Sequence, residues 1–442
     1  MNRRTVGALV GAIGLTVPWF VFWLSTLVTD RTAEGLSTNL TVLISGLSVL
    51  GAAFLLAWAA ETAERDVPRP FAIAVLAVLA VAPEYSVDAL YAWNAGAFAG
   101  TARGIEAGNL AVANMTGANR ILIGIGWAGI ALFTIYRSGA ASDPSVENRA
   151  GFLADVVTVQ RDLALDIVFL LAATLWAFFV PLFGGIDALD MVILVGLYAT
   201  YILVVLRGDI DPEEEHVGVP AALQAQPKWR RVGTVLTLFG YSGLLIFTAV
   251  EPFAHGLESI GTAIGVPSFF MIQWIAPLAS ESPELIVVVY LVNKARSTAG
   301  FNALISSKLN QWTLLIGTLV VVYSIASGAY GVLPFDAKQS AEIWLTAAQS
   351  FFALGILANF EISVREAVML LMLFVSQVLL EFLLIREVLV LPVDSHGLLL
   401  VYTGVYLVLG TFLFVRRREA VKTLFGRAGR TIRAALPQSV TN

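Results

Sequence analysis

The chain has 442 residues, of which 58% are hydrophobic and only 13% are charged. That charged share is about half of the usual share in soluble domains, so a single water-soluble core cannot bury the apolar surface. The net charge is −5, no basic surface indicates a nucleic-acid partner, and the lack of cysteine excludes disulfides, thiolate metal sites and cysteine nucleophiles.

The first apolar segment follows the basic start MNRRT and runs to about residue 28. A cleaved signal peptide is one interpretation, because such peptides also join a basic start to an apolar run. This run is longer than a typical signal-peptide core, and it ends in WLSTLVTDR without a small-residue cleavage site. We therefore expect a retained membrane-spanning helix.

Apolar runs separated by polar residues predict an all-α, polytopic transmembrane bundle with about twelve spans. Each run has the roughly 20 apolar residues that a helix needs to cross a bilayer. The predicted spans lie near 5–28, 39–62, 70–97, 108–136, 162–183, 188–206, 233–256, 263–292, 300–326, 341–360, 366–385 and 397–415.

The basic residues favour one orientation of these spans. If the N-terminus is cytoplasmic, most of the 27 Lys and Arg residues fall in cytoplasmic loops. Because positive charge collects on that side, we expect a multi-pass cell-membrane protein with both termini cytoplasmic. The basic, partly amphipathic tail from Arg416 is expected to lie against the anionic inner leaflet. Four basic residues lie in outer loops, namely Arg31, Arg103, Lys338 and Arg386.

The two halves of the chain share an unusual pattern, which predicts an internal repeat. Ala-x-Glu occurs late in one span of each half, at Glu61 and Glu251, and the next span is interrupted by proline before a glutamate, at Pro83-Glu84 and Pro283-Glu284. Spans 3 and 8 run in opposite directions, so the repeats are inverted in the membrane. We expect an extra helix (1–38), a first five-helix repeat (39–207), a cytoplasmic linker (208–232), a second repeat (233–390), and a last helix with the basic tail (391–442).

The linker contains the acidic run DPEEE. It lacks the alternating oxygen ligands and the central glycine of an EF-hand loop, so a solvated connection is favoured over a calcium sensor.

Buried carboxylates after helix breaks are the main candidates for chemistry. A proline within a span leaves backbone carbonyls without donors, and a cation can bind them. Glu84 and Glu284 follow such breaks, so we expect both near the bilayer midplane, where a carboxylate needs a positive partner. Asp88, Glu281 and the hydroxyl of Ser280 supply more of the hard oxygen ligands that sodium and calcium prefer.

The span after each Pro-Glu pair is unusually polar. The first contains GNLAVANMTGANR with Asn114 and Asn119, and the second contains GFNALISSKLNQ with Lys308 and Asn310. Glycines allow close helix packing here, and amides can bind ions or hydrogen-bond between helices.

These motifs together resemble the sodium/calcium exchanger superfamily, the cation/calcium antiporters. SESPEL at 280–285 and AVAPEY at 80–85 are similar to its Pro-Glu element, while ANMTGAN at 113–119 and NALISSK at 302–308 are similar to its Asn-rich element. The resemblance implies that Glu84 and Glu284 are central calcium ligands and that Ser280, Asn114 and Asn119 belong to flanking ion sites. Lys308 replaces the last Asn of its element, which implies altered or absent sodium coupling.

The expected function is secondary active antiport of calcium, or another cation, against sodium or protons by alternating access. The transported cation is substrate, and no resident cofactor is expected. One alternative is a cation/proton antiporter that uses a pair formed by Lys308 and a glutamate. Another is a non-transporting relic in which Lys308 and Arg120 plug the sites or form structural ion pairs with Glu284 and Glu84.

An intramembrane enzyme is not expected. The three histidines lie in loops or at span ends, and no HExxH or GxSxG motif lies in a span. The sequence leaves the transported ion and the oligomeric state open.

Overall fold

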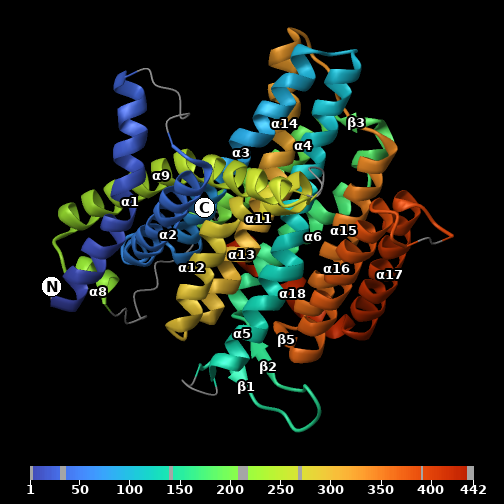
Figure 1. Cartoon of the computed structure of the whole chain (residues 1–442). Coiled ribbons are helices and arrows are strands. Elements are labelled where there is room, and N and C mark those ends of the chain that lie inside the picture. Colours follow the sequence, from blue (N-terminus) through green and yellow to red (C-terminus); the bar gives the residue numbers. More distant parts are fainter. Residues whose placement is uncertain are drawn as a thin grey trace, which may run out of the picture. The chain divides into compact units, whose positions relative to one another are not determined.

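The computed structural model describes residues 3–29, 36–138, 143–207, 218–266, 271–389 and 392–435. Within these ranges, ten helices are long and apolar enough to cross a membrane, and up to twelve if each of two bent helix pairs is one span. The predicted all-α, polytopic membrane fold is therefore confirmed (Figure 1).

Two compact units make up the chain, and each takes segments from both halves of the sequence. Unit 1 comprises Met1–Ser86 and Gly208–Tyr290, and unit 2 comprises Val87–Arg207 and Leu291–Asn442. Helices α3 and α12 pass from one unit into the other. The units describe packing, whereas the predicted repeats describe the order of spans along the chain and stay a prediction.

In unit 1, α2 packs along α9, and both contact α1. Leu55, Trp58 and Ala59 of α2 form a core with Val219, Leu223 and Leu238. Gly51 allows α1 to approach, because a Cβ there would lie 2.5 Å from the Ala12 carbonyl oxygen. The helices are α1 (Arg3–Thr29), α2 (Thr38–Ala63), the first part of α3 (Arg69–Ala97), α8 (Val219–Gln224), α9 (Lys228–Ala263), η5 (Met271–Ile275), α11 (Ala276–Ser280) and most of α12 (Ser282–Asn293).

Helix α9 differs from the sequence prediction. It continues to Ala263, whereas the predicted span ended near 256, although Pro252 lies inside the helix. A proline lacks the N–H that an interior helix position donates, but Pro252 is accommodated within this helix.

Unit 2 is built around α13, which is almost completely buried, and the second half of α4, which is buried from Ala111 to Ile121. Each polar helix runs directly into a π-helical segment, η2 after α4 and η6 after α13. The corresponding spans of the two halves thus share an irregular feature of a kind common at functional sites. The helices of the first half are α4 (Ala102–Ile121), η2 (Leu122–Trp127), α5 (Ala128–Ser138), η3 (Arg161–Leu163), α6 (Ala164–Ala177), η4 (Val180–Phe183) and α7 (Ala188–Leu206).

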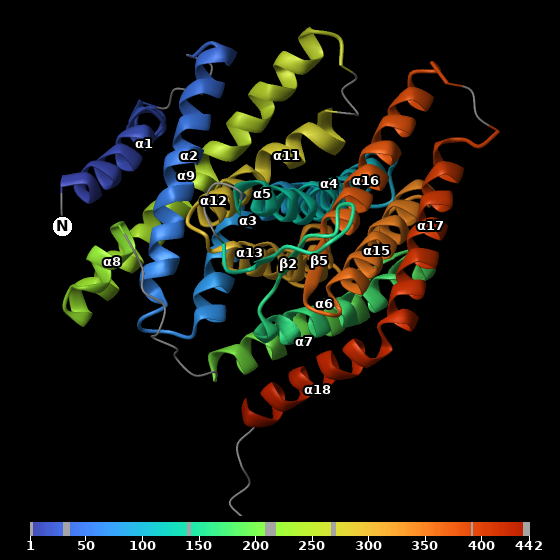
Figure 2. The ribbon, with the colours of Figure 1, turned by 90° about the horizontal axis from the view of Figure 1, so that it is seen from below.

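The second half supplies the remaining helices of unit 2. Figure 1 shows α15, α16 and α17 side by side, and Figure 2 shows α18 below α7. These helices are α13 (Ser297–Asn310), η6 (Gln311–Leu315), α14 (Ile316–Ser327), α15 (Ala337–Leu357), α16 (Val364–Ile385), α17 (Ser395–Arg416) and α18 (Arg418–Ala435).

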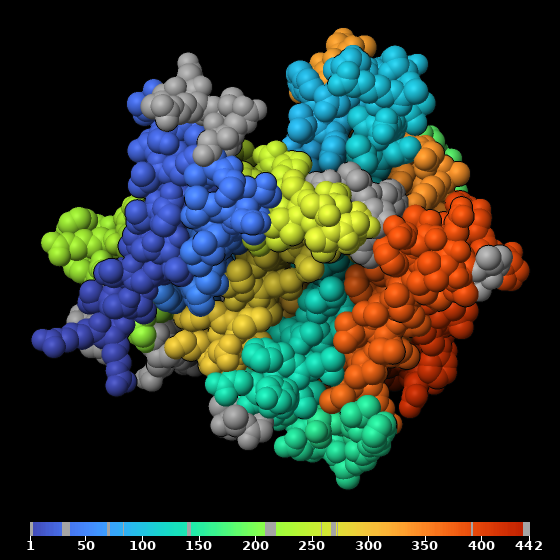
Figure 3. All heavy atoms as spheres, in the orientation of Figure 1, coloured from blue at the N-terminus to red at the C-terminus, as the bar shows by residue number. Residues whose placement is uncertain are grey.

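Glycines allow the backbones of unit 2 to approach closely. A Cβ at Gly96 would lie 2.3 Å from the Tyr323 carbonyl oxygen, and one at Gly108 would lie 2.2 Å from that of Pro334. Figure 3 shows the light-blue end of α3 and start of α4 next to the orange end of α14. The predicted role of glycine in helix packing therefore holds at these positions.

Two small antiparallel sheets join loops that are far apart in sequence. β2 (Val156–Thr158) pairs with β1 (Val146–Glu147) and with β5 (Glu361–Ser363), as Figure 2 shows for β2 and β5. β3 (Gly185–Ile186) pairs with β4 (Leu333–Pro334). Each sheet joins loops that the predicted alternation of spans places on the same side of the membrane, which supports the predicted span order.

The C-terminal helix α18 is amphipathic. Its buried residues are Leu424, Ala428 and Ala435, and it packs on α6 and α7. Arg207 fixes its end by donating from Nη1 to the Ala435 carbonyl at 3.1 Å. Part of the apolar face predicted to contact lipid is therefore covered by the protein itself.

Candidate cation site

Both spans that carry a Pro-Glu pair are bent. The axes of Phe71–Ala82 and Glu84–Ala97 differ by 52°, and those of Gln273–Ser280 and Ser282–Asn293 differ by 53°. A proline removes a helical hydrogen bond and clashes with the preceding turn, which favours such kinks. The interruption predicted in each half is therefore present, with Glu84 and Glu281 at the breaks.

Three predicted acidic ligands are buried in unit 1. Glu84 and Glu281 are each 2% exposed, and Glu284, in the first turn of α12, is 1% exposed. The Ser280 hydroxyl donates to the Pro277 carbonyl at 2.9 Å, which leaves its oxygen lone pairs for another ligand. Charged carboxylates at such depth need compensation by positive charge or hydrogen bonds.

Unit 2 brings Asp88 and Asn114 together. Asn114 Nδ2 donates to Asp88 Oδ1 at 2.9 Å, which links α3 to α4, and Asp88 is completely buried. Among the residues described, no hydrogen-bond donor contacts the other oxygen, Asp88 Oδ2. This oxygen can accept a proton or coordinate a cation.

Lys308 and Asn119 also meet in unit 2. Lys308 is completely buried, and its Nζ lies 3.4 Å from the Asn119 carbonyl oxygen and 4.2 Å from the centre of the Trp312 ring. The Asn119 amide donates to the Met115 carbonyl at 2.8 Å, while its Oδ1 has no donor in the described part of the chain. The ammonium therefore lies beside the backbone carbonyl of a residue that the family resemblance assigns to an ion site.

The other polar residues of α13 are buried as well. Asn310 is completely buried, and neither Asn302 Oδ1 nor Ser307 Oγ has a hydrogen-bond partner within the described ranges. No group of three His, Cys, Asp or Glu side chains there is arranged to hold a metal ion.

Arg120 forms an ion pair with a glutamate that the sequence did not point to. Its Nη2 lies 2.5 Å from Glu342 Oε2, and its Nη1 donates to Gln377 at 3.3 Å. Gln377 in turn donates to Glu381 at 2.8 Å. Sequence analysis did not single out Glu342 or Gln377, although a glutamate and a glutamine in predicted spans were a usable signal.

Two further buried polar contacts lie outside the predicted site. Tyr201 of α7 donates to Asp166 of α6 at 2.6 Å. Tyr290 donates to Glu61 at 3.2 Å, whereas Glu251, at the matching position of the second half, is half-exposed next to His255. The Ala-x-Glu elements are therefore not equivalent in structure.

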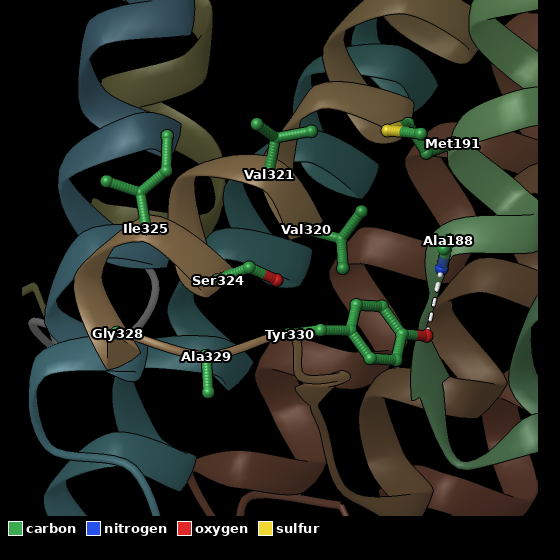
Figure 4. A pocket seen from close by; sticks show the side chains of 9 residues that line it. All are labelled: Ala188, Met191, Val320, Val321, Ser324, Ile325, Gly328, Ala329 and Tyr330. Carbon is green, nitrogen blue, oxygen red and sulfur yellow. Dashed lines mark hydrogen bonds between the residues drawn. The ribbon is translucent and has the colours of Figure 1, made fainter.

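The hollow in Figure 4 is a different feature. It has a volume of about 530 Å³, lies between α7 and the end of α14, and contains no predicted site residue. Its lining is mostly apolar, and the Tyr330 hydroxyl accepts from the Ala188 amide at 3.4 Å. Its chemistry does not suit a cation.

The sequence matches the family described as "Sodium/calcium exchanger protein" over residues 36–207 and 234–383. The chain belongs to the sodium/calcium exchanger family. This confirms the resemblance drawn from the Pro-Glu and Asn-rich motifs. A search among curated proteins gives no match.

Two solved structures show the same architecture as this exchanger-family chain. A structure titled as the H⁺/Ca²⁺ exchanger CAX is 40% identical, covers 98% of this chain and 99% of its own, and superposes with a TM-score of 0.79. The sodium-calcium exchanger NCX_Mj is 15% identical over 77% of this chain and 97% of its own, with a TM-score of 0.55. The second likeness shows the fold alone.

Proposed function

We propose that this family member exchanges Ca²⁺ for protons. The main supporting observation is the buried ammonium of Lys308 beside Asn119, at a motif position where the family has a neutral ligand. Because like charges repel strongly in a medium of low polarity, this ammonium disfavours a sodium ion at the same place. The 40% identical structure titled as an H⁺/Ca²⁺ exchanger supports the same coupling.

Glu84 and Glu284 are the proposed central ligands. Calcium takes six to eight oxygen ligands, and their buried carboxylates supply charged ones. Within unit 1, Ser280 and Glu281 are proposed to supply additional oxygens. Asp88, Asn114 and Asn310 are the proposed oxygen ligands of unit 2.

Competition for the same oxygen atoms would supply the coupling. A carboxylate that binds Ca²⁺ must be deprotonated, and one that is released into an apolar environment is most stable when protonated. Alternating exposure of this site to the two sides of the membrane would then move Ca²⁺ one way and protons the other. We assign no enzymatic activity to the chain.

The test is Ca²⁺ uptake into proteoliposomes that contain the purified chain. An imposed pH gradient should drive uptake, and a sodium gradient of equal size should not. Glu84→Gln and Glu284→Gln should abolish uptake, while Glu419→Gln, at an exposed position of α18, should leave it unchanged. Uptake driven by sodium alone would instead support the sodium-coupled alternative, and no uptake with any gradient would support the relic.

We further propose that both termini are cytoplasmic, because that orientation places most basic residues inside. The chain contains no cysteine, so a single introduced cysteine reports its own accessibility. An impermeant maleimide should label Ala329→Cys in intact cells and should label Glu419→Cys only after the membrane is opened. The reverse pattern would contradict this orientation.

A further inference from the structure

Unit 2 contains a second hollow, which is lined by arginines and lies apart from the candidate cation site. Its volume is about 390 Å³. Four arginines and two glutamates give the lining a formal surplus of two positive charges. The charged residues are Arg149, Arg365, Arg416, Arg417, Glu361 and Glu366.

Two of the arginines already compensate the two glutamates. Arg149 donates from Nη1 and Nη2 to the two Glu361 oxygens, each at 2.9 Å. Arg417 pairs with Glu366, and it also donates to the carbonyl oxygens of Gly355 and Ile356 at the end of α15. These contacts hold helix ends and the β5 loop together, and they leave little negative charge facing the hollow.

The other two arginines retain unused donors. Arg365 uses Nε to donate to the Phe152 carbonyl at 2.6 Å. Within the described part of the chain, its two Nη groups and all nitrogens of the Arg416 guanidinium have no hydrogen-bond or ion-pair partner. A guanidinium presents paired donors in a planar fork, which suits a phosphate group better than a spherical anion.

The depth of the hollow matches the headgroup layer of a bilayer. Three apolar helices end or begin there: α15 ends at Leu357, α16 begins at Val364, and α17 ends at Arg416. The ends of membrane-spanning helices lie at the boundary between hydrocarbon and headgroups. A phosphate bound there would be at the depth of lipid phosphates.

An exposed apolar strip on α17 leads to the same place. Val408, Phe412 and Val415 are 70%, 56% and 67% exposed. Phe412 and Val415 lie four and one residues before Arg416, and the spacing of 408, 412 and 415 places the three on one helix face. An acyl chain can lie along this strip while its headgroup is in the arginine hollow. A free phosphate ion has no apolar part and would not need the strip, so the strip favours a lipid.

We propose that this hollow binds the phosphate of an anionic lipid headgroup. Arg365 and Arg416 are the phosphate donors, and the acyl chain lies along α17. Arg149 and Arg417 shape the hollow through their contacts with Glu361 and Glu366. Basic pockets between membrane helices are suited to acidic lipid headgroups.

Native mass spectrometry of the purified full-length chain, titrated with phosphatidylglycerol or phosphatidylcholine, tests this proposal. Phosphatidylglycerol should remain bound at lower concentration than phosphatidylcholine. Arg365→Gln with Arg416→Gln should weaken phosphatidylglycerol binding about ten-fold or more, because charge-assisted hydrogen bonds are lost. The matched control is Arg103→Gln with Arg386→Gln, two exposed positions outside both the hollow and the basic tail.

Two further arms identify the source of the phosphate and exclude a folding artefact. If inorganic phosphate displaces phosphatidylglycerol and its own binding needs Arg365 and Arg416, the lipid assignment is overturned in favour of a soluble anion. Arg365→Lys with Arg416→Lys keeps the charge and should restore part of the lipid binding. Equal lipid binding by the wild type and the double Gln variant would overturn the proposal.

Discussion

Arg120 and Lys308 are both buried cations, and the contacts described for them differ. Each lies near the end of a polar helix that runs into a π-helical segment, α4 for Arg120 and α13 for Lys308. Arg120 forms an ion pair with Glu342 of α15, whereas Lys308 donates to the backbone carbonyl of Asn119.

The difference follows from helix geometry. Asn119 and Arg120 are neighbours in sequence, but successive helical residues point about 100° apart. The Asn119 carbonyl receives the Lys308 ammonium, while Arg120 reaches carboxyl and amide groups on α15 and α16. The direction in which a buried basic side chain points therefore decides which groups it contacts. Arg120 contacts α15 and α16, which suits a role in stability, whereas Lys308 contacts the Asn-rich motif.

Arg120→Gln should have the largest effect on stability. Removing one partner of a buried ion pair takes a positive charge away from Glu342 and costs about 3–5 kcal/mol. Thermal unfolding of the purified chain in detergent should show this loss, and Arg120→Gln with Glu342→Gln should recover most of it. An unchanged melting temperature with complete loss of transport would place Arg120 in the transport site instead.

Lys308→Asn should change coupling more than stability. It restores the residue type that the family has at this position, so the repulsion of a sodium ion beside Asn119 is removed. We expect the ratio of sodium-driven to proton-driven Ca²⁺ uptake to rise about ten-fold. Such a change corresponds to a free-energy difference of ~1.4 kcal/mol. Uptake rates with each gradient in proteoliposomes measure this ratio, and an unchanged ratio would separate Lys308 from ion selection.

Asp88→Asn should have a smaller effect on the same site. The variant keeps part of the contact with Asn114 but loses one carboxylate charge. The Ca²⁺ concentration that gives half-maximal uptake should therefore rise about five- to ten-fold. Asp66→Asn, in the loop between α2 and α3, is the matched control and should not change Ca²⁺ half-saturation. Equal effects of the two substitutions would argue against Asp88 as a ligand.

The smallest effect concerns Asp66, which pairs with an arginine near the helix ends. Arg231 donates from Nε and Nη2 to its two oxygens at 2.6 and 2.7 Å, and this hydrogen bonding lowers the Asp66 pKa from its usual 3.8. The stabilisation is present above pH 3.8 and is lost as the pH falls through the lowered pKa of the folded state.

Thermal unfolding between about pH 5 and pH 3 should therefore show a loss of about 1 kcal/mol that Asp66→Asn lacks. If the stability of Asp66→Asn falls with pH as much as that of the wild type, the loss of stability comes from other carboxylates.

The sequence predicted the spans well, because the length of an apolar run and the charge of a loop can be read directly along the chain. The span predicted at 188–206 coincides with α7, and both Pro-Glu breaks are bent in the structure. Helix α9 extends beyond the predicted span to Ala263, with Pro252 inside it.

Three-dimensional pairing was harder to predict. Glu342 and Gln377 are distant in sequence from Arg120, and no motif links them to it. In contrast, Asn114, Asn119 and Lys308 lie in the motifs that the resemblance aligned, and Asp88 lies three residues after one of them. The structure brings Asp88 to Asn114 and Lys308 to Asn119, while their role as ion ligands stays a prediction.

Simultaneous recording of Ca²⁺ and H⁺ fluxes in the same sodium-free proteoliposomes tests the central proposal most directly. Ca²⁺ entering the vesicles should be accompanied by proton release in a fixed ratio, and both fluxes should disappear together in Glu284→Gln. Ca²⁺ uptake without proton release, or uptake that begins only when sodium is added inside the vesicles, would contradict Ca²⁺/H⁺ exchange.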